Sequence, residues 1–178
     1  MNNLNPEKDF SNEDLITSLI ESYWISVKKL AFTYVKDWVL AEDITQEVFI
    51  KCYKNLDQFR RESSYKTWLY RVTVNRCKDE FKSKWFKTLW IFDEVKEKVG
   101  ENIVSAEVAY LKNYEETILS ELVLTLPVKY REVIIFYYYE GLSLEEIENL
   151  LELNINTIKT RLRRGKMLLK KLFERTGD

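Results

Sequence analysis

The chain has 178 residues, with 28 Lys and Arg against 29 Asp and Glu, no histidine, four glycines and two prolines. The near balance of charge argues against a protein that coats nucleic acid indiscriminately, and the missing histidine removes the commonest proton shuttle and metal ligand. So few glycines and prolines leave little material for hairpins, and the apolar residues follow the helical period. We therefore expect an all-α protein with one medium core or two small ones.

Several other functions are excluded by what the sequence lacks. It contains neither a glycine-rich phosphate loop nor a nucleophile elbow, and Cys52 and Cys77 are expected to be buried free thiols on separate helices. We therefore expect no catalytic residue, metal site or cofactor. No apolar run approaches the roughly 20 residues that span a bilayer, and the N-terminus lacks a signal-peptide pattern. This predicts a cytoplasmic protein without membrane insertion.

The first predicted helices lie between Leu15 and Lys54. Ser11 or Asn12 is expected to cap a first helix that carries Leu15, Leu19, Ile20 and Tyr23 inward. A second helix is expected over about 28–37 and a third over 41–54. At 100° per residue, one broad face of this third helix and the following turn is predicted to enter the core. Its members are Ile44, Val48, Cys52, Leu56 and Phe59, extended by Phe49 and Tyr53.

The opposite face of the third helix has an unusual composition. Asp43, Gln46, Glu47 and Lys54 surround a large aliphatic residue, Ile50. An exposed apolar side chain ringed by polar ones is typical of the centre of a protein interface. Single exposed apolar residues are also common on ordinary surfaces, so both interpretations stay open.

A polar loop over 57–64 is expected to precede a helix over 65–78, with Ser63 or Ser64 as its N-cap. One stripe of this helix carries Thr67, Arg71, Asn75, Lys78 and Lys82, bordered by Trp68. Aligned cations beside an aromatic ring suit a phosphate track with a stacking partner for unpaired bases. The alternative is an ordinary solvated stripe with Trp68 in the core.

Further on, the acidic segment 83–113 begins with aromatic residues between Trp85 and Phe92. We expect these aromatic residues either to pack on the first domain or to dock on a partner.

The last third of the chain predicts a helix-turn-helix. A helix over 115–125 carries Ile118, Leu119 and Leu122 inward, and the next, over 128–140, carries Val133, Ile134, Phe136 and Tyr137. Pro127 suits the start of the latter and Gly141 its end. Ser143 and Glu146 have the spacing of a capping box, residues 152–156 form a turn, and a last helix is expected from Thr157.

This last helix is strongly basic. Its inner side is predicted to hold Ile158, Leu162, Leu169 and Phe173, and its outer face Lys159, Thr160, Arg163, Arg164 and Lys171. Amide groups at its start are expected to meet phosphate while side chains of its first turns meet base edges. A basic amphipathic helix alone also suits a membrane surface or an acidic partner. The capped helix and short turn before it favour DNA.

Two motifs of the first half carry a family resemblance. The segments AEDITQEVF (41–49) and FRRESSYKTWLYR (59–71) closely resemble the first conserved domain of bacterial extracytoplasmic-function (ECF) sigma factors. The resemblance implies that the first segment docks on the β′ clamp helices of core RNA polymerase. The implied polymerase-binding residues are Asp43, Gln46, Glu47, Phe49 and Ile50. It also implies that the second segment recognises and helps open the promoter −10 element. The implied residues there are Arg60, Arg61, Ser64, Lys66, Thr67, Trp68, Arg71, Asn75 and Lys78.

The second half resembles the −35-reading domain of the same family through LPVKYREV (126–133), EGLSLEEI (140–147) and NTIKTRL (156–162). The implied DNA-binding residues are Ser143, Asn156, Thr157, Lys159, Thr160, Arg161, Arg163 and Arg164. The sequence departs from the family at Glu148, where alanine is usual, and at Glu152, where glycine is usual. A glutamate in a left-handed turn costs about 1 kcal/mol, so the local turn geometry is expected to differ.

The resemblance implies two small helical domains, at 10–84 and 114–176, joined by a linker at 85–113. It implies core RNA polymerase (β′ clamp helices and β flap), promoter DNA and an anti-sigma factor as partners, and no catalytic centre. Two other classes remain as alternatives: a polymerase-independent helix-turn-helix regulator and a purely protein-binding adaptor. The near-neutral charge favours the polymerase-dependent function, because promoter affinity then depends on association with the enzyme.

Overall fold

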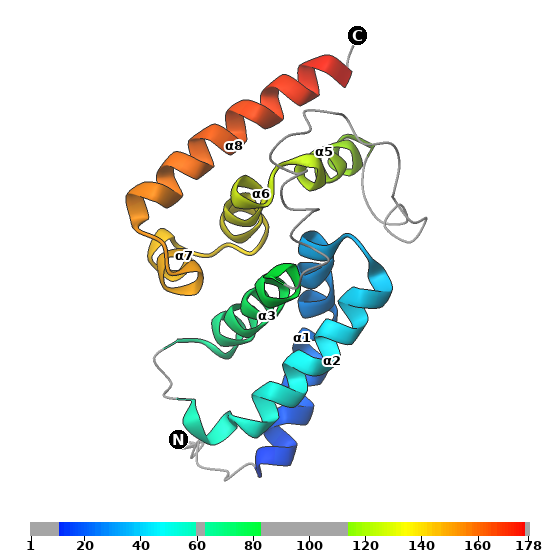
Figure 1. Ribbon diagram of the computed structural model, residues 1–178, viewed down its shortest axis with the longest axis vertical. Coiled ribbons are helices and arrows are strands. Elements are labelled where there is room, and N and C mark those ends of the chain that lie inside the picture. The colour runs from blue at the N-terminus through cyan, green and yellow to red at the C-terminus, as the bar shows by residue number, and fades with distance from the viewer. Residues whose placement is uncertain (1–10, 60–62, 83–113, 177–178) are drawn as a thin grey trace, which may run out of the picture. The chain divides into compact units, whose positions relative to one another are not determined.

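The computed structural model describes residues 11–59, 63–82 and 114–176, with side chains from Leu119 to Arg175 in the last range. All regular elements in these ranges are helices, which confirms the all-α fold class. The chain divides into two compact units, Met1–Glu80 and Phe81–Asp178 (Figure 1). The predicted linker, with its aromatic segment Trp85–Phe92, lies outside the described residues. None of the helices described is both long enough and apolar enough to cross a membrane.

The first unit begins with one long helix, α1 (Asn12–Val35), where the sequence predicted two. Ser11 is the N-cap, and its Oγ accepts the Asp14 N–H at 3.1 Å. The expected break before Lys28 is wrong because no glycine or proline interrupts this stretch and Val27, fully buried, keeps the helix against the core. The helix ends at Lys36, whose left-handed backbone (φ 55°) turns the chain.

Helix α2 (Trp38–Lys54) starts three residues before the predicted Ala41. The reason is Asp37, whose carboxylate accepts the N–H groups of Val39 and Leu40 at 2.8 and 3.0 Å. α2 packs along α1, and the predicted core residues Ile44, Val48, Cys52 and Leu56 are all buried. Tyr53 is 46% exposed, so it does not extend the core face as expected. Its position lies one residue past Cys52, at the edge of the buried stripe.

A short 3₁₀ turn, η1 (Leu56–Gln58), leads towards α3 (Tyr65–Lys82). Ser64 is the N-cap of α3, since its Oγ accepts the Thr67 N–H at 3.1 Å. The core side of α3 is formed by Leu69, Tyr70, Val74 and Cys77, which are all buried. Phe59, which precedes the loop, is half-buried and stacks on Tyr65.

The second unit contains α5 (Tyr114–Thr125), α6 (Val128–Ile134), the π-helical segment η3 (Ile135–Tyr139), α7 (Leu144–Leu151) and α8 (Ile155–Thr176). Figure 1 shows α8 running past α7, α6 and α5 in turn, and all three contact it. Gly165 permits the close approach to α6, because a Cβ there would lie 3.2 Å from Ile134 Cγ1.

The α5–α6 connection is fixed by a buried cation. Arg131 is 2% exposed, and its Nη1 donates to the carbonyl oxygens of Leu124 (2.6 Å) and Leu126 (3.1 Å). These bonds satisfy carbonyl groups that the end of α5 leaves without a helical partner. Pro127 immediately precedes α6 as its N-cap, one position before the predicted place.

Three expected core positions of this unit are exposed instead. Tyr137 is 39% exposed because the π-helical turn inserts an extra residue and rotates it off the inner face. Leu119, in the middle of α5, is 41% exposed, and Phe173, in the last turn of α8, is 50% exposed. The capping box of Ser143 and Glu146 and the stop at Gly141 (φ 67°) are confirmed.

Candidate functional site

The outer face of α2 presents four of the five residues assigned to polymerase. Asp43, Gln46, Glu47 and Ile50 are exposed, Ile50 by 54%. Phe49 is different, because it is 4% exposed and stacks on Trp24 of α1 with ring centroids 5.7 Å apart. It supports this face from beneath and offers no surface of its own.

One α2 residue is tied to α3. Glu47 forms an ion pair with Arg76, and Arg76 Nη1 also donates to Glu80 at 2.6 Å. The hydrogen bond from Arg76 lowers the pKa of Glu47 below its ordinary value. Arg76 was not among the residues expected at this face. Its spacing to Glu80 was visible as an i,i+4 pair, but no sequence pattern links it to Glu47, 29 residues away.

The predicted polar stripe on α3 is only partly exposed to solvent. Asn75 and Lys82 are exposed, while Arg71 and Lys78 are half-buried. Thr67 is 2% exposed, with its Oγ1 2.9 Å from Ser64 Oγ, so both hydroxyls serve the helix start rather than an open stripe. Lys66 Nζ lies 5.5 Å from the centroid of the Tyr70 ring. Arg60 and Arg61 lie outside the described residues.

Trp68 belongs to a small aromatic cluster. Its ring centroid is 5.0 Å from that of Phe59, and Phe59 lies 4.5 Å from Tyr65. Trp68 is half-buried, so one part of the ring supports the loop end and another part faces outward. Nearby on the helix, the Nε of Arg71 is buried and has no hydrogen-bond partner among the described residues.

The basic face of α8 is exposed as predicted. Its open members are Asn156, Thr157, Lys159, Thr160, Arg163 and Arg164. Arg161 is half-buried and donates from Nη1 to Glu132 Oε1 at 2.8 Å, with Glu132 only 5% exposed. Ser143 is exposed, but its Oγ accepts the Glu146 N–H at 3.1 Å to cap α7.

The start of α8 corrects two expectations. The helix begins at Ile155, two residues before Thr157. Glu148 is half-buried, and its Oε1 accepts the Ile155 N–H at 3.0 Å, so this departure from the family joins α7 to α8. Glu152 itself takes the left-handed conformation (φ 56°) that favours glycine, so the turn keeps its geometry and the expected difference is not found.

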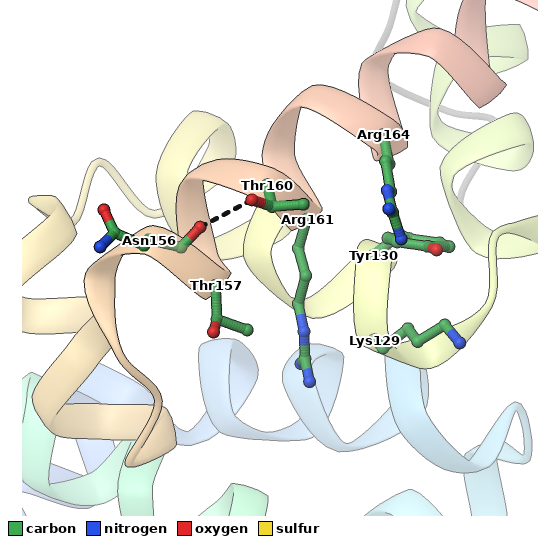
Figure 2. Close-up of a pocket in the computed structure, with 7 residues that line it drawn as sticks. All are labelled: Lys129, Tyr130, Asn156, Thr157, Thr160, Arg161 and Arg164. Carbon is green, nitrogen blue, oxygen red and sulfur yellow. Dashed lines mark hydrogen bonds between the residues drawn. The ribbon is translucent and has the colours of Figure 1, made fainter.

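A cavity of about 360 Å³ lies between the start of α6 and the first turns of α8. Figure 2 shows its lining, with the Arg164 side chain running towards Tyr130. The lining residues are Lys129, Tyr130, Asn156, Thr157, Thr160, Arg161 and Arg164. The sequence does not reveal Lys129 and Tyr130 as part of this site, because they lie about 25 positions before Ile155, where α8 begins. Only the packing of α6 on α8 brings them there.

Comparison with known proteins matches both units. Residues 19–87 fit the family model of sigma-70 region 2, and residues 116–169 fit that of sigma-70 region 4. The ECF RNA polymerase sigma factor SigW of Bacillus subtilis is 33% identical over 90% of this chain and 89% of its own length. SigV of the same organism is 30% identical over 92% and 94%. The ECF sigma-E factor of Escherichia coli K12 is 31% identical over 83% and 81%.

Solved structures show the same fold. The sigma factor RpoE of Bartonella quintana, solved with the anti-sigma factor NepR, superposes with a TM-score of 0.68 at 22% identity, covering 89% of this chain and 96% of its own. CnrH, solved with the cytosolic domain of CnrY, gives 0.64 at 18% identity over 92% and 90%.

Region 2 followed by region 4 defines the class of RNA polymerase sigma factors, which are non-enzymatic factors of transcription initiation. Within that class, the chain belongs to the ECF family. It binds core RNA polymerase and directs promoter recognition, DNA melting and the initiation of transcription.

Proposed function

We propose a division of this activity among three surfaces. The α2 face of Asp43, Gln46, Glu47 and Ile50 binds core polymerase. The Trp68–Arg71–Lys78 side of α3 holds the opened −10 element, and the outer face of α8 reads the −35 element. The observation that carries the proposal is the separation of these faces from the core: the α2 and α8 residues are exposed while their helices are anchored by Ile44 and Ile158, both 0% exposed.

The polymerase face is tested by reversing its chemistry. Ile50→Glu and Asp43→Lys should weaken binding to core polymerase at least tenfold, because a charge at the centre of an apolar contact is costly to desolvate. The matched control is Glu21→Lys, on the exposed side of α1. Circular dichroism should show unchanged helicity. Wild-type affinity for core enzyme in both variants would remove this surface from the proposal.

The α3 surface is tested by separating promoter opening from initial binding. Arg71→Ala, Lys78→Ala and Trp68→Ala should reduce permanganate reactivity of unpaired thymines more than they reduce closed-complex formation, since unpaired bases are held by stacking and cations. Thermal melting of each variant distinguishes the two roles of Trp68. A Trp68→Ala protein that melts much earlier, yet opens promoters normally once folded, would leave Trp68 a packing residue.

The α8 surface is tested by selection of −35 sequences with holoenzyme. Lys159→Ala, Thr160→Ala and Arg163→Ala should each relax the preference at one position, with a loss of roughly 1–3 kcal/mol for a bidentate base contact. Lys170→Ala and Lys171→Ala, two turns further on, should weaken binding to all promoters alike. An unaltered −35 preference in the first three variants would reduce α8 to an electrostatic anchor.

We further propose that an anti-sigma factor regulates this protein in the cytoplasm. The support is the Bartonella quintana sigma factor, which was solved with one. A candidate anti-sigma factor should compete with core polymerase for the wild-type chain and release it when excess core is added. Simultaneous binding of both, in a stable ternary complex that initiates normally, would exclude inhibition by this route.

The alternative of a polymerase-independent regulator makes an opposite prediction. The free chain, with a formal net charge of −1, should bind promoter DNA weakly without core enzyme. A sequence-specific footprint of the free protein at 150 mM salt, equal in extent to that of the holoenzyme, would favour the alternative.

A further inference from the structure

The N-terminus of α8 is occupied by the protein itself. The N–H of Ile155 donates to Glu148 Oε1 at 3.0 Å, and that of Asn156 donates to Asn154 Oδ1 at 2.9 Å. The N–H groups of Thr157 and Ile158 both donate to the Asn154 carbonyl, at 2.8 and 3.1 Å. The first four amides of the helix, which would otherwise attract an anion, therefore already have acceptors.

Glu148 adds a second obstacle at the same place. A phosphate that approached the first turn of α8 would meet a carboxylate already seated on the helix dipole, and like charges repel. Both features argue against the expectation that amide groups of this helix meet phosphate. If α8 lies in the groove, a phosphate of the promoter backbone must bind at another site on the protein.

The α6–α8 cavity supplies the chemistry that the helix start lacks. Lys129 comes from the first turn of α6 and Arg164 from the third turn of α8, and both line it together with the Tyr130 ring. Arg161 is held in the cavity wall by Glu132, because its Nη1 donates a hydrogen bond to the Glu132 carboxylate. That nitrogen of the Arg161 guanidinium is therefore already engaged within the protein. Arg164 has no acidic partner among the described residues, so its planar fork is available to an anion.

We infer that a phosphodiester of the promoter backbone is seated in this cavity, on Arg164 and Lys129, and that the start of α8 takes none. The inference rests on the proposed reading of the −35 element by α8. At 100° per residue, Arg164 lies about a quarter turn around the helix from Arg163, towards α6. Arg163 thus faces the bases, while Arg164 reaches a phosphate of the adjacent DNA strand. Arg164 thereby sets how deeply α8 enters the groove.

The test measures the salt dependence of promoter binding by holoenzyme. Arg164→Ala should lower the slope of log affinity against log salt by about one phosphate contact, roughly 0.9, and leave the −35 preference unchanged. Lys129→Ala should lower it similarly. The conservative variant Arg164→Lys should recover most of the slope. Lys166→Ala is the matched control, since this exposed cation of the same helix faces away from the cavity and should leave the slope unaltered.

Single methylphosphonate substitutions along the −35 backbone locate the contact. One position should weaken wild-type binding and have no further effect on Arg164→Ala. Additive losses at every position would overturn the inference. If wild-type holoenzyme selects −35 sequences but Arg164→Ala keeps the full slope, the cavity assignment fails while the proposed function stands. Loss of −35 selection in the wild type itself would instead remove the function.

A soluble phosphate compound could occupy the same cavity in place of the DNA backbone. Calorimetric titration of the free chain with inorganic pyrophosphate should give no saturable binding at millimolar concentration. Saturable binding that Arg164→Ala abolishes, and that Lys166→Ala preserves, would overturn the assignment to DNA.

Discussion

Glu132 and Arg161 link α6 to α8 through a carboxylate that is only 5% exposed. The family resemblance implied that Arg161 binds DNA, but its Nη1 is directed to this carboxylate at 2.8 Å. A side chain with a buried anionic partner stabilises the domain before it contributes to any ligand. Neighbouring cations on one helix can thus have different roles, and only their partners distinguish them.

Arg161→Ala is therefore expected to cost about 1.5–3 kcal/mol of unfolding free energy, the range for a hydrogen bond to a charged group. Arg163→Ala, at an exposed position, should stay within about 0.5 kcal/mol of wild type. Urea unfolding of both variants makes the comparison. Equal stability of the two would show that the Glu132 bridge contributes nothing measurable.

The two thiols provide a second measurement at this scale. Both side chains are 0% exposed, and burial raises the pKa of Cys52 and of Cys77 to about 12 from an ordinary value of 9.0. At pH 8 this strongly lowers the fraction of reactive thiolate. Iodoacetamide should therefore label neither residue in the native chain and both in urea, as read by mass spectrometry. Rapid native labelling of Cys77 would contradict the packing of α3.

At the scale of elements, α2 and α3 are joined by the ion pair of Glu47 and Arg76. The pKa of Glu47 is lowered from 4.5, chiefly by the hydrogen bond from Arg76. A lowered carboxyl pKa means that the stabilisation is complete above pH 4.5 and is lost as pH falls through the lower folded value. The same residue lies on the proposed polymerase face, so its ion pair also fixes that face against α3.

Glu47→Gln should consequently flatten part of the stability loss below pH 4.5. The measurement is urea unfolding between pH 3 and pH 6. Glu21→Gln, on the exposed side of α1, is the matched control and should retain the wild-type acid profile. Superimposable profiles for wild type and Glu47→Gln would show that the bridge does not couple to folding.

The turn between α7 and α8 combines a strained backbone with a side-chain hydrogen bond that joins the two helices. Glu152 has φ 56°, a conformation that costs a side-chain residue about 1 kcal/mol. Glu148 holds the next helix through the Ile155 N–H. The strained backbone of Glu152 is tolerated because Glu148 anchors the helix that follows.

Glu152→Gly should thus raise stability by up to about 1 kcal/mol, whereas Gly141→Ala, at φ 67°, should lower it by about as much. A Cβ at Gly141 would meet nothing within 4 Å, so the second change measures the backbone alone. Glu148→Ala should cost about 1 kcal/mol as a lost cap, and Glu148→Gln, which still accepts the N–H, should cost less. Thermal melting of the four variants tests these signs.

At the scale of the whole molecule, the two units have separate cores and separate proposed contacts. Substitutions in one should therefore act independently of substitutions in the other. Asp43→Lys should weaken core binding and Arg163→Ala should relax −35 choice. The double variant should show the sum of both free-energy changes within about 0.5 kcal/mol. A larger deviation, measured by holoenzyme assembly and promoter titration, would reveal coupling between the units.

The sequence by itself determined the class of fold, the helix-turn-helix and the family. These follow from local rules: apolar residues at the helical period, the capping box of Ser143 and Glu146, the stop at Gly141 and the motifs at 41–49 and 59–71. The exposed face of α2 and the basic face of α8 also followed, since a face is a property of one helix. The continuous α1 did not, because weak helix-breaking signals are decided by tertiary burial at residues such as Val27.

Only the tertiary structure decided which side chains are open to partners. Phe49 lies on Trp24, Thr67 is enclosed at the start of α3, and Arg161 reaches Glu132. The cavity under Arg164 likewise requires α6, whose Lys129 lies about 25 positions before the start of α8 in the chain. Helical periodicity specifies direction around one axis, but contacts between distant segments depend on how helices cross. For that reason the faces were predictable from this sequence, and their exact partners were not.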